Sequence, residues 1–194
     1  MPNLYIIAGC NGAGKTTASK IMLPEIFDCT EFVNADNIAA ELSPLDVESV
    51  AFEAGRIMLN RINKLIEGKV DFAFETTLST RSYVSLIKKA QSLGYKITLF
   101  FFWLDSPEMA KIRVADRVSE GGHNIPLDVI ERRYFRGIYN LINLYIPICD
   151  SWVIVNNENT ITNSIAEGGY DIDVMIINMD IWSTISKQSV HREK

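Results

Sequence analysis

Residues 9–16, GCNGAGKT, most constrain what this chain can fold into, because they match the pattern G-x-x-x-x-G-K-[ST] of phosphate-binding loops. An apolar run at residues 4–8, typical of a buried strand, precedes the loop, and a predicted helix that we expect to stop at Pro24 follows it. The glycines let backbone N–H groups approach phosphate closely, and the helix N-terminus adds a positive dipole end. The sequence therefore predicts a nucleotide phosphate site near the N-terminus.

Two side chains of this loop have distinct predicted roles. Lys15 would reach the outer phosphates as a point charge, and the Thr16 hydroxyl would ligate Mg²⁺. Cys10 also lies in the loop, and we interpret it as a small filler residue more than as a site of oxidation. The residues that we expect to bind the nucleotide are Gly9, Asn11, Gly12, Ala13, Gly14, Lys15, Thr16 and Thr17.

Strand and helix patterns alternate along the rest of the chain. Strands are predicted at residues 31–36, 70–75, 95–104 and 152–155, with one more short strand at residues 165–166. Helices are predicted from Ser43 or Asp46 to residue 67, from Thr80 or Ser82 to Gly94, after Ser106, at residues 127–145 and at residues 180–187. This alternation predicts an α/β, three-layer P-loop NTPase fold with a parallel sheet of about five strands and a helical lid.

Length and composition favour a single domain. We expect residues 1–194 to form it, with the lid at about 107–145 and a C-terminal extension at about 157–194. No apolar run reaches the roughly 18 residues that a membrane span needs, and the N-terminus lacks the basic segment of a signal peptide. The three cysteines have no paired or metal-ligand spacing, so we predict a cytoplasmic location. The net charge of −5 argues mildly against nucleic-acid binding.

Two predicted strands end on a carboxylate, Asp36 and Glu75. Because the carboxyl ends of parallel strands share one edge of a sheet, we expect both acids beside the phosphate loop. Asp36 would act as the general base that takes a proton from an attacking hydroxyl; the alternative is a helix-capping role. Glu75, with Thr76 beside it, would bind acceptor hydroxyls; the alternative is a structural hydrogen bond. We therefore assign Asp36, Glu75 and Thr76 to substrate binding, and Asp36 with Lys15 to catalysis.

Five arginines follow at helical spacing in a locally basic segment. Arg113 and Arg117 are four residues apart on one predicted helix, and Arg132 and Arg136 on the next, with Arg133 beside them. Two such helices, joined by a pair of glycines, can close over a triphosphate, because guanidinium groups are always charged and forked toward phosphate oxygens. A lid that excludes water favours transfer to an acceptor over hydrolysis. The alternative is a solvated charged face paired with nearby acids.

Four segments, in this order, resemble the zeta toxin family of P-loop kinases, most closely its small stand-alone branch. They are residues 9–17, residues 33–36 (VNAD), residues 72–79 (FAFETTLS) and residues 121–134, which begin GGHNIP and end IERRY. The resemblance spans roughly residues 4–155. The phosphate loop alone is common to many proteins, so the specificity lies in the order of the four segments.

This resemblance implies an ATP- and Mg²⁺-dependent kinase whose acceptor, as in zeta toxins, is a UDP-N-acetyl amino sugar. It implies Asp36 as the base and Glu75 as the sugar-binding acid, with arginines of the lid clamping the phosphates. It also implies that an antitoxin protein can be a partner of this chain.

The arginines of the lid are assigned by position in the resembling segments. Arg117 matches the first clamping arginine, while Arg132, Arg133 and Arg136 compete for the second role. We expect Arg117 and Arg133 to act in catalysis, and Arg117, Arg132 and Arg136 to bind the nucleotide.

Two other functions stay open at this point. One is a regulatory ATPase or nucleotide switch that acts through a partner, and the other is a nucleic-acid end kinase, which shares this scaffold. A GTPase is not predicted, because the chain has no Asn-Lys-x-Asp sequence that reads guanine. ATP consumption that depends on an acceptor favours the kinase, and slow hydrolysis without an acceptor favours the switch.

Overall fold

The computed structural model describes residues 1–157 and 163–190. The strands of this part of the chain are β1 (Asn3–Gly9), β2 (Phe32–Val33), β3 (Phe72–Thr76), β4 (Lys96–Trp103), β5 (Ser151–Asn156), β6 (Asn163–Gly169) and β7 (Ile172–Ile176). They form one sheet in the order β2-β3-β1-β4-β5-β6-β7. The neighbours from β2 to β5 pair in parallel, and the β5–β6 and β6–β7 pairs are antiparallel.

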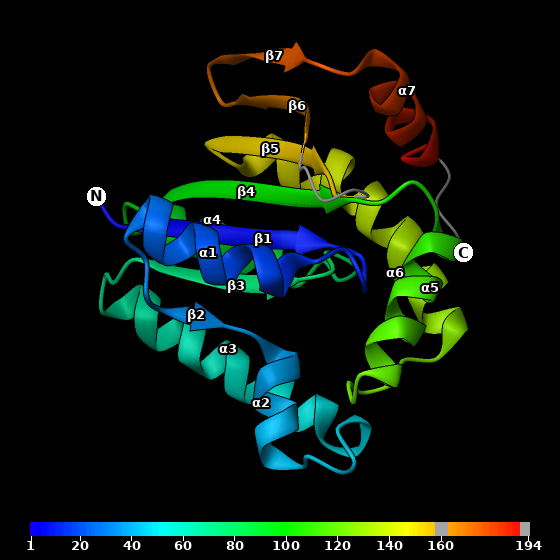
Figure 1. Cartoon of the computed structure of the whole chain (residues 1–194). Helices are drawn as coiled ribbons and strands as arrows, with labels where there is room; N and C mark the ends of the chain where they lie inside the picture. The colour runs from blue at the N-terminus through cyan, green and yellow to red at the C-terminus, as the bar shows by residue number, and fades with distance from the viewer. Residues whose placement is uncertain (158–162, 191–194) are drawn as a thin grey trace.

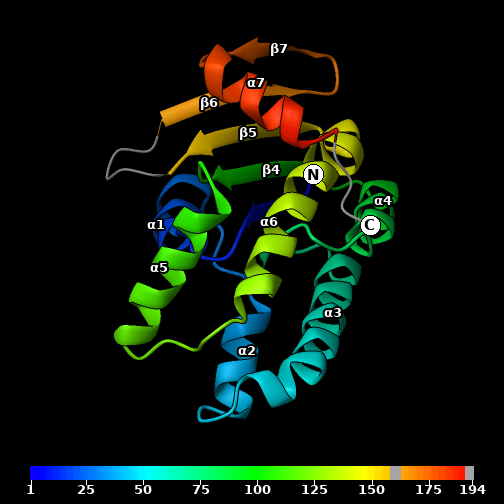
Figure 2. The same ribbon diagram turned by 90° about the vertical axis from the view of Figure 1, so that its right-hand side faces the viewer.

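Helices cover both faces of this sheet. They are α1 (Lys15–Phe27), α2 (Ala35–Leu42), α3 (Ala51–Glu67), α4 (Tyr83–Ser92), α5 (Pro107–Ser119), α6 (Leu127–Asn140) and α7 (Met179–Gln188), with 3₁₀ turns at Glu48–Val50 and Ile146–Ile148 and a π turn at Leu141–Tyr145. In Figures 1 and 2, α1 lies on one face of the sheet and α3 and α4 lie on the other. The predicted three-layer α/β fold is therefore confirmed. None of the described helices is long and apolar enough to cross a lipid bilayer.

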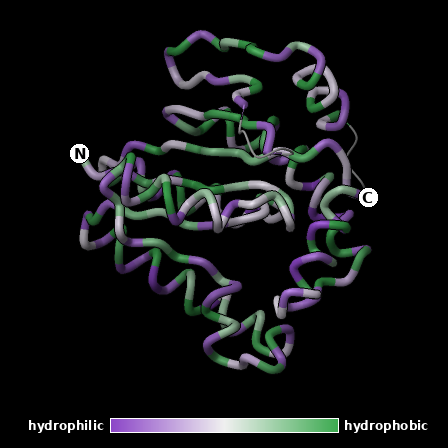
Figure 3. The backbone as a smooth tube through the Cα atoms, viewed as in Figure 1, coloured by the Kyte–Doolittle hydropathy of each residue, from purple (hydrophilic) through white to green (hydrophobic). Residues whose placement is uncertain are grey.

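The core lies along the central strands. β1 runs between β3 and β4, and Leu4, Ile6 and Ile7 are fully buried there. A parallel strand that is covered on both faces reads as a continuous apolar run, and the hydrophobic residues follow these strands in Figure 3. The register pairs Ile7 of β1 with Glu75 of β3. The carboxyl ends of both strands consequently meet at one edge of the sheet, where α5 and α6 also lie (Figure 1).

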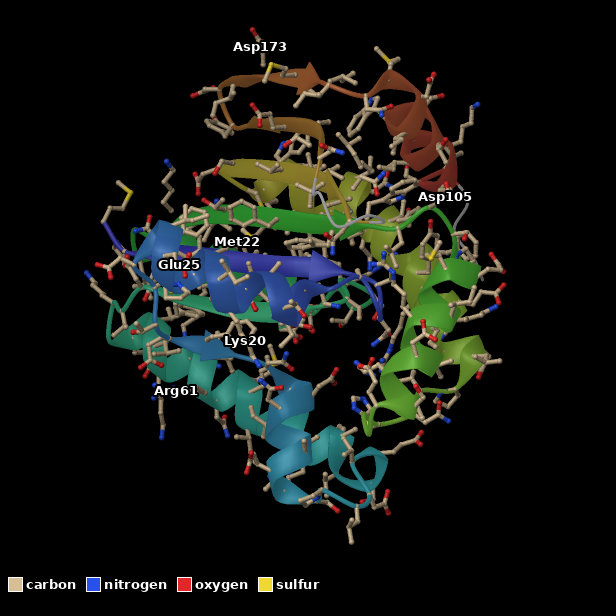
Figure 4. The ribbon with its side chains drawn as sticks, in the orientation of Figure 1. Lys20, Met22, Glu25, Arg61, Asp105 and Asp173 are labelled. Atoms are coloured by element: carbon tan, nitrogen blue, oxygen red, sulfur yellow. The ribbon has the colours of Figure 1, made fainter. Side chains whose placement is uncertain are left out.

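The prediction that Pro24 stops the first helix is wrong, since α1 continues to Phe27. Proline has no N–H, so the carbonyl of Lys20, one turn earlier, loses its helical partner. Lys20 lies on the exposed side of α1, where water can satisfy that carbonyl (Figure 4). The helix ends at Asp28, whose backbone has the left-handed φ of 48° that is common at helix C-termini.

Asp36 begins a helix and does not end a strand. The predicted strand at residues 31–36 is only Phe32–Val33, because the Asn34 side-chain oxygen accepts the N–H groups of Asp36 (2.8 Å) and Asn37 (3.3 Å) and so caps α2. The apolar pattern did not predict α2, since two turns are too short to establish a helical period. Asp36 consequently lies in the first turn of α2.

The C-terminal part of the sheet exceeds the prediction of about five parallel strands. The predicted short strand at residues 165–166 is the middle of β6. The sequence did not predict β7, none of whose residues is buried in the structure. The predicted closing helix is α7, and its Trp182 ring stacks on Trp152 of β5 at 6.1 Å. Of the predicted extension at 157–194, residues 158–162 and 191–194 lie outside the described residues.

The three cysteines are buried free thiols. Burial raises the pKa of Cys10 to about 11, although the nearby Lys15 ammonium acts in the opposite direction. At neutral pH this residue is therefore a thiol, whereas the thiolate is the reactive form. These properties agree with the interpretation of Cys10 as a small filler residue in the loop.

We predict that Cys10 in the folded protein resists alkylation. At pH 8 its reaction with iodoacetamide should be at least about 10-fold slower than in guanidinium-unfolded protein, because both the thiolate fraction and the access are small. Peptide-resolved mass spectrometry of timed samples measures this, with the unfolded protein as the control. Equal labelling rates in the two states would contradict the assignment.

Candidate active site

Three predicted site residues meet at the carboxyl edge of the sheet. Lys15 opens α1 directly after the phosphate loop, Asp36 lies in the first turn of α2, and Glu75 lies near the end of β3. They line two adjoining hollows of about 350 Å³ and 180 Å³. The residues that line both hollows are Asn11, Lys15, Asn34, Asp36 and Glu75.

The larger hollow, which we call the phosphate hollow, lies between the phosphate loop and α5. It is lined by Gly12, Gly14, Thr16 and Thr17 of the loop and by Arg113 and Arg117 of α5. Gly12 and Gly14 have φ of 78° and 79°, which L-residues rarely adopt. A Cβ atom on Gly12 would also lie 3.0 Å from the Ala110 carbonyl oxygen of α5. The loop therefore needs glycine both for its backbone conformation and for the close approach of α5.

The smaller hollow, which we call the hydroxyl hollow, lies beyond the end of β3. Five hydroxyl side chains line it, together with Met58 of α3 and Arg133 of α6. Burial raises the pKa of Tyr83, so its hydroxyl remains protonated and can donate a hydrogen bond. The five hydroxyl residues are Thr76, Thr77, Ser79, Thr80 and Tyr83. Such a lining suits a small ligand that carries several hydrogen-bonding groups.

Glu75 is the polar centre between the two hollows. Its Oε2 accepts hydrogen bonds from the Thr16 hydroxyl (2.7 Å) and the Asn34 amide (2.8 Å), and its Oε1 lies 3.5 Å from Lys15 Nζ. Lys15 Nζ also donates to the Cys10 carbonyl (2.9 Å). The Lys15 and Glu75 side chains are only 7% and 10% exposed, so these contacts provide the partners that buried charges require. The structural hydrogen bonds that the sequence left as an alternative are thus present.

Three of the five arginines lie at the hollows. Arg117 donates to the His123 carbonyl (3.1 Å), and its buried Nε has no hydrogen-bond partner within residues 1–157 and 163–190. Arg113 donates to the backbone carbonyl at position 157 (2.8 Å). Arg133 Nη1 lies 3.4 Å from Asn11 Oδ1, a long contact that leaves the guanidinium available to a ligand of the hydroxyl hollow.

Arg132 and Arg136 are exposed on α6 and line neither hollow, so the structure does not bring these two residues to the site. Arg132 points about 100° round the helix from Arg133, and Arg136, three residues further on, points about 60° round in the same direction, so both turn away from the hollows. Their expected contact with the nucleotide stays a prediction.

The helices α5 and α6 are fastened to each other and to the sheet. Lys111 of α5 and Glu131 of α6 form an ion pair with N and O atoms 2.5 Å apart. The Tyr134 hydroxyl donates to the carbonyls of Leu104 (2.8 Å) and Asp105 (2.9 Å), just after β4. Asp105 itself, labelled in Figure 4, lines neither hollow. The arginines of both helices therefore project from supported positions.

Sequence reasoning missed two asparagines that support the site. Asn34 holds Glu75, and an asparagine just before an acid and an apolar segment is an N-cap pattern that could have identified it. Asn157, after β5, donates from its amide to the Ala13 carbonyl of the phosphate loop (2.7 Å), and no local pattern indicates this contact. Gly9 and Ala13 form part of the loop but line neither hollow.

Comparison with known proteins supports the family resemblance. The family model described as Zeta toxin matches residues 1–162 of the 194. An uncharacterised protein of Haemophilus influenzae is 29% identical over 127 residues, which make up 65% of this chain and 88% of that protein.

Solved structures share the fold at low sequence identity. One match is a chain of the crystal structure of AvrRxo1-ORF1:-ORF2 with ATP, with a TM-score of 0.75 and 17% identity. The match covers 100% of this chain but only 66% of the AvrRxo1 chain, just under two thirds. A chain of the PezAT toxin-antitoxin system of Streptococcus pneumoniae matches 97% of this chain and is itself 86% covered, with a TM-score of 0.67 and 17% identity. A gluconokinase from Sinorhizobium meliloti 1021 matches 81% of this chain and is 83% covered, with a TM-score of 0.53 and 12% identity.

The family model covers most of the chain. Among the residues that carry the resemblance, Lys15 of the phosphate loop, Asp36 and Glu75 line both the phosphate hollow and the hydroxyl hollow. The predicted resemblance is confirmed: this chain belongs to the zeta toxin family of P-loop kinases.

Proposed function

We propose that this chain transfers the γ-phosphate of ATP to a hydroxyl group of a small acceptor, with Asp36 as the general base. One observation carries the proposal: a phosphate-binding hollow and a hydroxyl-lined hollow adjoin, and Lys15, Asp36 and Glu75 form their common wall. ATP in the first hollow and an acceptor in the second would meet at these side chains. Transfer of a phosphoryl group depends mainly on such positioning and on charge neutralisation.

The donor side would bind ATP through the loop and through positive charge. The backbone N–H groups of the loop and the ammonium of Lys15 would hold the phosphates, while Arg117 would neutralise the charge that develops during transfer. The Thr16 hydroxyl and the Glu75 carboxylate are oxygen ligands 2.7 Å apart, which fits the preference of Mg²⁺ for oxygen. Bound there, Mg²⁺ would neutralise phosphate charge.

The acceptor side would depend on Asp36 and on the hydroxyl hollow. Asp36 is exposed to both hollows and would accept the proton of the attacking hydroxyl as the new P–O bond forms. Arg133 would pair with an anionic group of the acceptor, and Thr76 would donate or accept a hydrogen bond. As in zeta toxins, we propose a UDP-N-acetyl amino sugar as the acceptor.

Partners and location are also proposals. The PezAT relative belongs to a toxin-antitoxin system, and AvrRxo1-ORF1 is crystallised with ORF2, which supports an antitoxin partner for this chain. The free thiol form of the cysteines fits a cytoplasmic location.

The test of the function is acceptor-dependent ATP consumption. Purified protein is incubated with γ-labelled ATP, Mg²⁺ and UDP-N-acetylglucosamine, and separately with a metabolite extract, and labelled products are identified by mass spectrometry. Label in a sugar or another metabolite supports the kinase. Slow ATP hydrolysis that no acceptor accelerates would instead support the regulatory ATPase.

We predict that Asp36→Asn lowers kcat for transfer by about 10²-fold or more, the usual contribution of a general base, while ATP binding is retained. Stopped-time transfer assays and titration with a non-hydrolysable ATP analogue measure the two quantities. Asp180→Asn is a matched control, because Asp180 also lies in the first turn of a helix capped by an asparagine. An Asp36→Asn variant with the wild-type transfer rate would refute the assignment of the base.

We predict that Glu75→Gln lowers kcat by about 10-fold or more, since charge-assisted hydrogen bonds to Thr16 and Asn34 are lost together with the charge opposite Lys15. Steady-state kinetics with both substrates varied measures this. Glu31→Gln, which breaks an exposed ion pair with Arg61, is the control. A rise confined to the KM of the acceptor would instead support the acceptor-binding role that the sequence predicts for Glu75.

A further inference from the structure

The turn after β3 holds a leucine in an unusual backbone conformation. Leu78 is fully buried and has φ of 55°, in the left-handed region that branched and bulky residues rarely occupy. Such a conformation persists only where the surroundings fix it, and it often occurs at ligand-binding loops. Thr77, Ser79 and Thr80, on either side of Leu78, line the hydroxyl hollow. The conformation of Leu78 therefore decides where three hydroxyl side chains lie in this hollow.

Buried hydrogen bonds fix this turn from two directions. The Leu78 N–H donates to the Thr76 hydroxyl (3.0 Å), within the turn itself. From the α6 region, the Asn140 amide donates to the Leu78 carbonyl (2.6 Å), and the Tyr145 hydroxyl donates to the Thr80 carbonyl (2.6 Å). Asn140 is 4% exposed and lines neither hollow. Its polar contact is thus directed to the backbone of the turn and not to a ligand.

The same side of α6 meets both the turn and the phosphate loop. Arg133, Gly137 and Asn140 are spaced by four and three residues, so they share one face of the helix. Arg133 approaches Asn11 of the phosphate loop. A Cβ atom on Gly137 would lie 2.6 Å from the Thr77 carbonyl oxygen, so only glycine allows α6 to lie this close. One helical face thus fits against two walls of the candidate site.

We propose that Asn140 is a positioning residue for the acceptor: through the Leu78 carbonyl it holds residues 77–80 in the conformation that presents their hydroxyls to the hydroxyl hollow. Gly137 acts with it by allowing α6 to pack on the turn. The inference rests on the proposed phosphotransfer. It means that two residues outside both hollows, Asn140 and Gly137, affect how tightly the acceptor binds. It predicts a change on the acceptor side alone, because neither residue contacts the phosphate hollow.

Two variants disturb the turn in different ways. Asn140→Ala removes the amide that holds the Leu78 carbonyl, and Gly137→Ala displaces the Thr77 carbonyl while favouring the helix itself. Each has a control. Asn143→Ala removes an amide that bonds the Tyr139 and Ser189 carbonyls, away from the turn. Gly55→Ala adds a methyl group to α3 where, apart from its chain neighbours and the backbone of the helix itself, no atom of the described residues lies within 4 Å.

The experiment measures steady-state kinetics with ATP and UDP-N-acetylglucosamine, together with hydrogen exchange of the peptide covering residues 76–82. For Asn140→Ala we expect a rise of about 10-fold in the KM for the sugar nucleotide, the effect of one lost buried hydrogen bond, and for Gly137→Ala a rise in the same KM because the Thr77 carbonyl is displaced. The KM for ATP should stay within about twofold, and exchange in the peptide should accelerate. The control variants should behave as the wild type in all three measurements.

The outcomes separate the two proposals. If the wild type transfers no phosphate to UDP-N-acetylglucosamine, the proposed acceptor is wrong, and hydrogen exchange alone decides whether Asn140 holds the turn. If the wild type is active but Asn140→Ala keeps its KM for the sugar nucleotide, the positioning role is overturned. Unchanged exchange in both variants, or an equal rise in the KM for ATP, also overturns it. Should Asn140→Ala fail to fold, Gly137→Ala gives the same decision.

Discussion

The carboxylate of Glu75 is the constraint on which the candidate site depends. Donors from two other segments converge on it, Lys15 and Thr16 after β1 and Asn34 at the start of α2, so that with β3 three segments meet at this carboxylate. A charge this buried is costly unless it is paired and hydrogen-bonded, so the three segments can reach their places only together. The sheet register makes this possible by pairing Ile7 with Glu75. A slip of one residue would turn the carboxylate to the other face of the sheet.

The structure also divides the chemistry of the site between its two sides. The phosphate hollow combines a glycine loop with two arginines of α5, whereas the hydroxyl hollow combines neutral hydroxyls with Arg133 of α6. These helices are joined by the Lys111–Glu131 ion pair, and Tyr134 fastens α6 to the chain just after β4. These contacts hold α5 and α6 against each other and against the end of β4. The packed part of the arginine-bearing segment is therefore fixed in place and does not form a freely moving lid. Any closing motion would have to begin at the connection between α5 and α6, which has few buried residues.

The sequence was informative where the signal is local. The phosphate loop, the buried strand at residues 95–104 and the Ser106-Pro107 start of α5 each follow from a short pattern, and all are present. It was less informative where tertiary context decides. Pro24 does not end α1, and Asp36 belongs to α2 because the Asn34 side chain captures two backbone N–H groups.

The candidate site divides in the same way. The shared edge for Lys15, Asp36 and Glu75 could be predicted, since parallel strands align their carboxyl ends. The arginines could not be ranked, because helical spacing identifies a face but not its neighbour. Arg133 lines a hollow, while Arg132 and Arg136 point elsewhere. Likewise, no spacing in the sequence connects Asn140 to a turn 62 residues earlier.

The strand order carries a consequence for the growing chain. β1 pairs with β3 and β4 and not with β2, so β1, once synthesised, has no partner among the described strands until β3 follows it. At about 5–20 residues per second, this apolar segment waits for several seconds in an unpaired state. The β6–β7 hairpin, by contrast, joins strands that are adjacent in sequence and can form as soon as it is made. A translation pause before β3 would therefore lengthen the period in which the unpaired β1 is open to aggregation and to chaperone binding.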